Sequence, residues 1–167
     1  NRAPINSFWV GVLMPWKQES ITIGHRVPKE IRLAPAARSD VAAMGGYVRG
    51  RNGISFQYKA RTLDAQGTPM DVEIDPLQAT VLVLPKGRAI KTESTNMAFR
   101  RDVLIAIGGF DPAFRFYLDE TDVNMRLARA GYATALVPLA QVHHGFAASA
   151  MRRADRAPRD LYEIGAS

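Results

Sequence analysis

A predicted helix over 119–130 constrains the fold more than any other segment, because several independent signals mark its first turn. Asp119 can act as the N-cap, since an aspartate oxygen at that position accepts from the backbone N–H groups of the first turn. Asp122 then occupies the third helical position, as in a capping box, and Leu118 can pack against Val123 as a hydrophobic staple. These signals define where the helix begins.

One face of this helix is apolar, and its end is also marked. The apolar stripe consists of Val123, Leu127 and Ala130. Asp122 and Arg126 stand four residues apart, so they can pair along the helix surface. Gly131 stands where a left-handed residue commonly ends a helix, and Gly108-Gly109 has the same explanation at the end of a helix near 102–107.

The remaining pattern alternates strands with helices. Strands are predicted near 8–14, 41–49, 54–59, 79–84, 133–137 and 140–144, and a further helix near 147–156. Asn52-Gly53 between two apolar stretches predicts a two-residue hairpin turn. This alternation favours a layered α/β sheet of mixed strand direction.

Composition restricts the chain to a few classes of protein. With 167 residues and 47% hydrophobic content, it can form one domain with a substantial core. It has no cysteine, which excludes disulfides, thiolate zinc sites and cysteine nucleophiles. No apolar run approaches the roughly 20 residues of a membrane span and no signal-peptide pattern opens the chain, so we expect a soluble cytoplasmic protein.

Three acidic residues gather at the start of the predicted 119–130 helix. Capping and the helix dipole favour carboxylates in a first turn without any chemistry. That explanation assigns a cap to Asp119 and a partner to Asp122, but it leaves Glu120 with only a weak dipole contribution. Glu120 is therefore the carboxylate for which we expect a chemical role.

Four separate blocks follow one another between Ser94 and His144. They are Asn96-Met97-Ala98-Phe99-Arg100-Arg101, then Ile107-Gly108-Gly109-Phe110-Asp111, then Asp119-Glu120-Thr121-Asp122-Val123 with Arg126, and finally Val137-Pro138 before His144. In their order and spacing these blocks resemble the C-terminal half of family 2 glycosyltransferases.

The resemblance implies a GT-A fold, in which helices flank a Rossmann-like mixed sheet. It also implies a nucleoside-diphosphate sugar donor, most simply a UDP-sugar, a Mn²⁺ or Mg²⁺ ion on the diphosphate, and inversion at the anomeric carbon. A complete GT-A domain is longer and this chain opens on Asn1, so we expect it to be truncated on the N-terminal side. Residues 8–14 can form the first strand of a nucleotide-binding sheet. In a second register, which we favour, 39–48 resembles the strand that follows the metal-binding acidic motif of the family.

In that family the second member of an acidic pair at this helix start is the general base, which takes a proton from the acceptor hydroxyl. By position this residue is Glu120, with Asp119 beside it. The order Asp-Glu departs from the commoner Glu-Asp and lengthens the arm of the base by one methylene, a change that can shift acceptor preference or mark lost activity. The helix N-terminus favours the charged form that a base needs.

The resemblance also assigns residues to the donor. Asn96, Arg100 and Arg101 would lie where the donor and acceptor pockets meet. The two arginines point to different sides of an extended segment, so at most one faces the site, where a guanidinium suits phosphate oxygens. A solvated basic turn is the other interpretation. Arg51 lies in a segment that faintly resembles a nucleotide contact, and a hairpin turn competes with that interpretation.

His144 matches a family histidine that can lie near the metal or the diphosphate, although a strand-end histidine bonded to backbone explains it equally well. His143 would face the opposite side of an extended segment. The Asp-x-Asp motif that holds the metal in the family is not evident. Asp71, Glu73 and Asp75 share one face of an extended segment, but they lie too near Asn96 for the family pattern and are better explained as solvated acids.

The net charge of +6 suits an anionic partner. We divide the single domain of residues 1–167 into a poorly assigned part (1–90), an acceptor and catalytic half (91–150) and a basic C-terminal tail (151–167). The tail carries Arg152, Arg153, Arg156 and Arg159, which suit peripheral contact with an anionic membrane or a solvated helix face.

Three functions remain open. The first is an inverting glycosyltransferase, and the second is an inactive glycosyltransferase-like protein that binds nucleotide diphosphate and metal. A basic nucleic-acid-binding module comes last, because the chain has no recognisable reading motif and no basic-aromatic platform. We therefore expect a nucleotide-sugar donor and an acceptor as partners and no nucleic acid.

Overall fold

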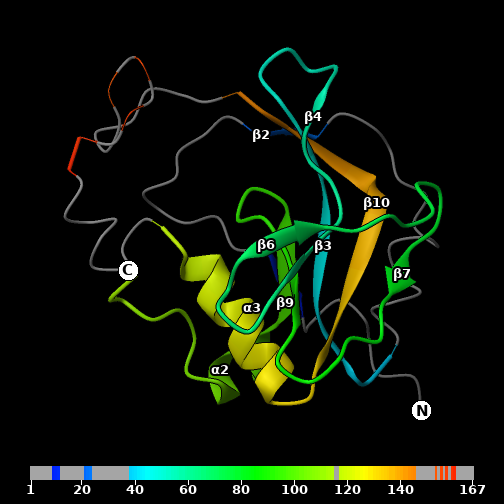
Figure 1. Ribbon diagram of the computed structural model, residues 1–167, viewed down its shortest axis with the longest axis vertical. Helices are drawn as coiled ribbons and strands as arrows, with labels where there is room; N and C mark the ends of the chain where they lie inside the picture. Colours follow the sequence, from blue (N-terminus) through cyan, green and yellow to red (C-terminus); the bar gives the residue numbers. More distant parts are fainter. Residues whose placement is uncertain are drawn as a thin grey trace.

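The protein is an α/β protein built mostly of strands around a mixed sheet (Figure 1). The structure, a computed structural model, describes residues 9–11, 21–23, 38–114 and 117–145, together with Arg153, Asp155, Ala157, Arg159 and Asp160. Within these residues no helix is long and apolar enough to cross a membrane. Most of the helix predicted near 147–156 lies outside the described residues.

The larger sheet contains seven of the described strands. They are β1 (Trp9–Gly11), β2 (Ile21–Ile23), β3 (Val41–Arg49), β4 (Phe56–Tyr58), β7 (Thr80–Val81), β9 (Met97–Arg100) and β10 (Ala133–His144). The main path runs β1-β9-β3-β10-β2, with β4 added to β3 and β7 to β10. β3 and β10 are parallel and the other pairs are antiparallel, which confirms the predicted mixed direction.

Three short strands form a second, antiparallel sheet that the sequence pattern did not predict. Its order is β6 (Pro69–Asp71), β5 (Arg61–Leu63) and β8 (Ala89–Lys91). Each strand has only three residues, too few for an alternation of apolar and polar positions to be recognised. Pro69 opens an edge strand, where its missing N–H costs no ladder hydrogen bond.

The predicted helix is present as α3 (Asp119–Arg129), but it begins differently from the prediction. Leu118, not Asp119, is the N-cap; it has a left-handed backbone with φ 62° and makes no side-chain cap hydrogen bond. Leu118 is also exposed, while Val123 is fully buried, so the predicted staple is wrong. The predicted pair of Asp122 with Arg126 is confirmed, with Arg126 Nε donating to Asp122 Oδ2 over 2.8 Å.

The end of α3 follows the prediction closely. Gly131 has φ 84° and donates to the carbonyl of Ala128, and the next N–H, of Tyr132, reaches back to Leu127. This pair of hydrogen bonds is a Schellman motif, which only a residue tolerant of the left-handed region completes without strain. Ala130 is exposed rather than part of the apolar stripe.

A second helix among the described residues, α2 (Arg101–Ala106), ends in the same way. Gly108 donates to the carbonyl of Ile105, and Gly109 donates to that of Leu104. The predicted stop at Gly108-Gly109 is therefore confirmed.

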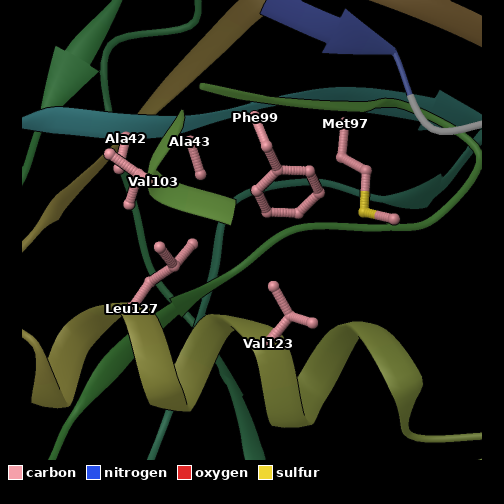
Figure 2. Close-up of a cluster of buried hydrophobic side chains, with 7 residues drawn as sticks. All are labelled: Ala42, Ala43, Met97, Phe99, Val103, Val123 and Leu127. Atoms are coloured by element: carbon pink, nitrogen blue, oxygen red, sulfur yellow. The ribbon is translucent and has the colours of Figure 1, made fainter. Parts of the chain in front are cut away.

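The main core lies between α3 and the larger sheet (Figure 2). Val123 and Leu127 of α3 point toward Phe99 of β9, which is fully buried, and toward two alanines of β3. The members of the cluster are Ala42, Ala43, Met97, Phe99, Val103, Val123 and Leu127. Full burial of a Val, Leu, Phe or Met side chain contributes about 1.5–3 kcal/mol, so this face holds the helix against the sheet.

β10 is one continuous strand, whereas the sequence predicted two. Its pairing with β3 shifts register between Val137 and Gln141, where Pro138 lies. At this point the side-chain amide of Asn96 donates to the carbonyls of Tyr47 (2.9 Å) and Ala140 (2.7 Å). Asn96 therefore bridges β3 and β10 where regular pairing is interrupted.

Close backbone approach at Gly46 explains why glycine stands there, and it generates a prediction. A Cβ atom at this position would lie 1.9 Å from the carbonyl oxygen of Ala140 and 2.5 Å from Nδ2 of Asn96. We predict that Gly46→Ala lowers the free energy of unfolding in urea by about 2 kcal/mol or more. Gly50→Ala is the matched control, since its Cβ would meet nothing closer than 3.6 Å. Equal stability of the two variants would contradict the close approach.

Candidate functional site

A cleft of about 360 Å³ opens beside the first turn of α3. The cleft collects side chains from both sheets, from α3 and from the loops between them. Its lining residues are Tyr58, Arg61, Gly67, Pro69, Lys91, Glu93, Ser94, Thr95, Tyr117, Leu118, Glu120, Thr121 and His144. Two of the predicted site residues, Glu120 and His144, therefore line one cavity although they come from different elements.

Four charged side chains form a compact cluster in this cleft, which we call the charge cluster: Arg61, Lys91, Glu93 and Glu120. Lys91 Nζ lies 3.1 Å from Glu120 Oε1 and 3.8 Å from Glu93 Oε2. Arg61 forms an ion pair with the other oxygen of Glu93. Two cations and two carboxylates thus meet in one place, and each side chain of the cluster is at most 15% exposed.

Burial controls the ionisation of Glu93. Removing its carboxylate from water raises the pKa of Glu93 above its ordinary value of 4.5. The nearby charges of Lys91 and Arg61 act in the opposite direction, and the negative charge of Glu120 adds to the rise. The negative charge of Glu120 therefore contributes to the raised pKa of Glu93.

The position of Glu120 follows from how α3 begins. The left-handed turn at Leu118 starts the helix without a side-chain cap. Asp119 is then directed into the protein, where it is 2% exposed and does not line the cleft. Glu120, one residue later, lines the cleft instead. The adjacent acids of the predicted pair thus occupy different environments.

His144 ends β10 at the edge of the cleft, with its Nδ1 2.9 Å from Oε1 of Gln57. His143, the next residue back along the strand, places Nε2 3.0 Å from the carbonyl oxygen of Arg51. Across the described part of the chain, no group of three His, Asp or Glu side chains is arranged to hold a metal ion. The acids at 71, 73 and 75 are exposed, as expected for solvated side chains.

The residues predicted to bind the donor are not brought together in the cleft. Asn96 is engaged by two backbone carbonyls between β3 and β10, a structural role. Arg100 pairs with Asp102 (2.7 Å) and donates to the carbonyl of Ser39, and Arg101 is exposed at the start of α2. None of these three residues lines the cleft.

Arg51 lies in the loop between β3 and β4, the predicted hairpin. The hairpin exists, but its connection is longer than two residues: Gly50 donates to the carbonyl of Ser55 across it. Gly53 takes φ 69°, and the Asn52 side-chain oxygen accepts from the N–H groups of Ile54 and Ser55. The turn interpretation therefore accounts for this segment, with Arg51 exposed.

Three charged residues of the cleft were missed from the sequence. Lys91 and Glu93 stand two apart, so an extended segment places them on one face, and this spacing was an available signal. Arg61 had no comparable signal, because β5 and β8 pair across a long stretch of chain.

A scan of known protein-family models and a search of curated proteins found no match to the chain.

The raised pKa of Glu93 predicts how stability depends on pH. Between the ordinary pKa of 4.5 and the higher value in the folded protein, the native state binds more protons than the unfolded chain. The free energy of unfolding therefore falls as the pH rises through this window. We predict that the ¹³C carboxyl resonance of Glu93, assigned with Glu93→Gln, titrates above 4.5 and that this variant loses the corresponding pH dependence in urea unfolding. A midpoint at or below 4.5 would count against burial as the dominant effect.

Proposed function

We propose that the chain is a glycosyltransferase of the GT-A type, in which Glu120 acts as the general base of an inverting transfer from a nucleoside-diphosphate sugar, with UDP as the first nucleotide to test. The observation that carries this proposal is that two residues singled out from the sequence line the same cleft: Glu120, selected by the capping argument and by the resemblance, and His144, selected by the resemblance. Cationic side chains in that cleft, Arg61 and Lys91, suit an anionic donor.

The proposed chemistry needs one base and one leaving group. The Glu120 carboxylate takes the proton of an acceptor hydroxyl as the hydroxyl oxygen attacks the anomeric carbon of the donor. A new carbon–oxygen bond forms on one face of the sugar, and the bond to the diphosphate breaks on the other. The nucleoside diphosphate departs with the electron pair of the broken bond, and the anomeric centre is inverted.

A divalent metal would supply charge neutralisation at the diphosphate. His144 is the residue of this chain that the resemblance assigns to that ion. No further His, Asp or Glu joins it in a metal-binding group within the described residues. The described side chains therefore do not form a fitting metal site, and the steps above involve no metal.

A second candidate function is nucleotide binding without transfer. It is favoured by the order Asp119-Glu120, which departs from the commoner order of the family, and by the absence of an evident Asp-x-Asp motif in the sequence. Sugar transfer in a broad acceptor screen would reject this alternative.

Donor binding is tested by thermal unfolding with a panel of nucleoside diphosphates, each with and without Mn²⁺. A ligand that binds only the native state raises the melting temperature, so we predict a selective rise with UDP. Equal responses to all nucleotides, or none, would argue against a nucleotide-sugar site.

The role of Glu120 is tested by Glu120→Gln, which keeps the size of the side chain and removes its basicity. We predict that transfer from the UDP-sugar falls about 10²–10⁴-fold, while the thermal response to UDP persists. Glu73→Gln is the matched control, because Glu73 is an exposed carboxylate outside the cleft. Full activity of Glu120→Gln would remove this residue as the base.

A further inference from the structure

Lys91 is the residue that joins the two carboxylates of the charge cluster. Its Nζ donates to Glu120 Oε1 (3.1 Å) and to Thr121 Oγ1 (3.4 Å), and it lies 3.8 Å from Glu93 Oε2. The side chain is only 9% exposed. A lysine this far from water is expensive to bury unless acceptors surround it, and two of these three acceptors lie in the first turn of α3.

We propose that Lys91 is a positioning residue for the transfer reaction, holding the carboxylate of Glu120 in one orientation and in its ionised form. The inference rests on the proposed function, because it assigns Lys91 a role in preparing the base. It adds a residue that lies in none of the blocks carrying the resemblance.

The balance of charge gives the physical reason. Before transfer, the two cations of the charge cluster face two carboxylates. When Glu120 takes the acceptor proton it becomes neutral, and Lys91 and Arg61 then face Glu93 alone. The cluster therefore resists protonation of Glu120 by solvent, which keeps the base available at lower pH, at the cost of some basicity.

The other groups that line the cleft with Glu120 come from several elements. Arg61 comes from β5 and Glu93 follows β8, while Thr121 lies beside Glu120 in α3. Tyr58 of β4, Tyr117 before α3 and His144 of β10 complete the titratable lining. Lys91 Nζ lies in direct contact with the Glu120 carboxylate, 3.1 Å from its Oε1.

The first test is the pH profile of kcat/KM for transfer from a UDP-sugar. Lys91→Met removes the positive charge and keeps an unbranched side chain. Because Glu120 then lacks its cationic partner, the acid limb of the kcat/KM profile of this variant should move to higher pH by about one unit or more. Lys91→Arg should restore most of the shift, and Lys86→Met is the matched control, since Lys86 is exposed and outside the cleft. An acid limb that stays in place in a folded Lys91→Met would overturn the proposal.

The second test needs no activity. The variants Lys91→Met and Glu120→Gln and the double variant are compared in urea unfolding. If the two side chains are in direct contact, the double variant should lose less free energy of unfolding than the sum of the losses of the two single variants. The difference should correspond to about threefold or more in the unfolding equilibrium constant. Additive losses would overturn the proposal, whatever the activity.

The two tests separate the possible failures. Non-additive stability in the double variant together with an active Glu120→Gln would reject Glu120 as the base, and the role of Lys91 would be rejected with it. Coupling together with an inactive Glu120→Gln and an unmoved acid limb would reject Lys91 alone. A wild-type protein that transfers no sugar would reject both proposals. If Lys91→Met does not fold, the pH profile of Lys91→Gln decides by the same criterion.

Discussion

Burial of α3 on two sides is the constraint on which the arrangement of the cleft depends. Val123 and Leu127 pack against the larger sheet, and Met125 packs with Leu63 and Ala89 of the smaller one. A helix held on both sides has little freedom to rotate, so the direction of each side chain in its first turn is set by the core. Glu120 reaches Lys91 because the apolar residues that follow it are fixed.

The charge cluster is difficult to explain by stability alone. Two cations and two carboxylates that are nearly excluded from water carry a desolvation cost that their mutual attraction only partly offsets. Apolar side chains of similar volume would commonly stabilise such a site as well or better. The charge cluster lines a cleft at the start of a helix, a position that suits the binding of a charged ligand. Carboxylates with a shifted pKa, such as Glu93, are frequent in functional sites.

The sequence predicted those elements that carry local signals and missed those defined by distant pairing. The helix end at Gly131, the pair of Asp122 with Arg126 and the strand over 41–49 follow from spacing within a few residues, and all are present. The smaller sheet was missed because its strands are short and its pairing joins β5 to β8 across a long stretch of chain. The sequence predicted only some of the residues of the cleft. Glu120 was singled out because helix capping explained the acids on either side of it, whereas Arg61 was recognised as a cleft residue only from the tertiary structure. Asp119 was predicted to be the N-cap because an aspartate side chain can accept from the first-turn N–H groups. In the structure the N-cap is Leu118, which has a left-handed backbone.

The most direct measurement is a crystal structure of the protein grown with UDP and Mn²⁺. The account predicts a diphosphate in the cleft beside the first turn of α3, with Lys91 in contact with Glu120 and the Glu120 carboxylate directed at the space next to the phosphates. UDP bound elsewhere on the protein, or Glu120 directed into bulk solvent away from the nucleotide, would contradict it.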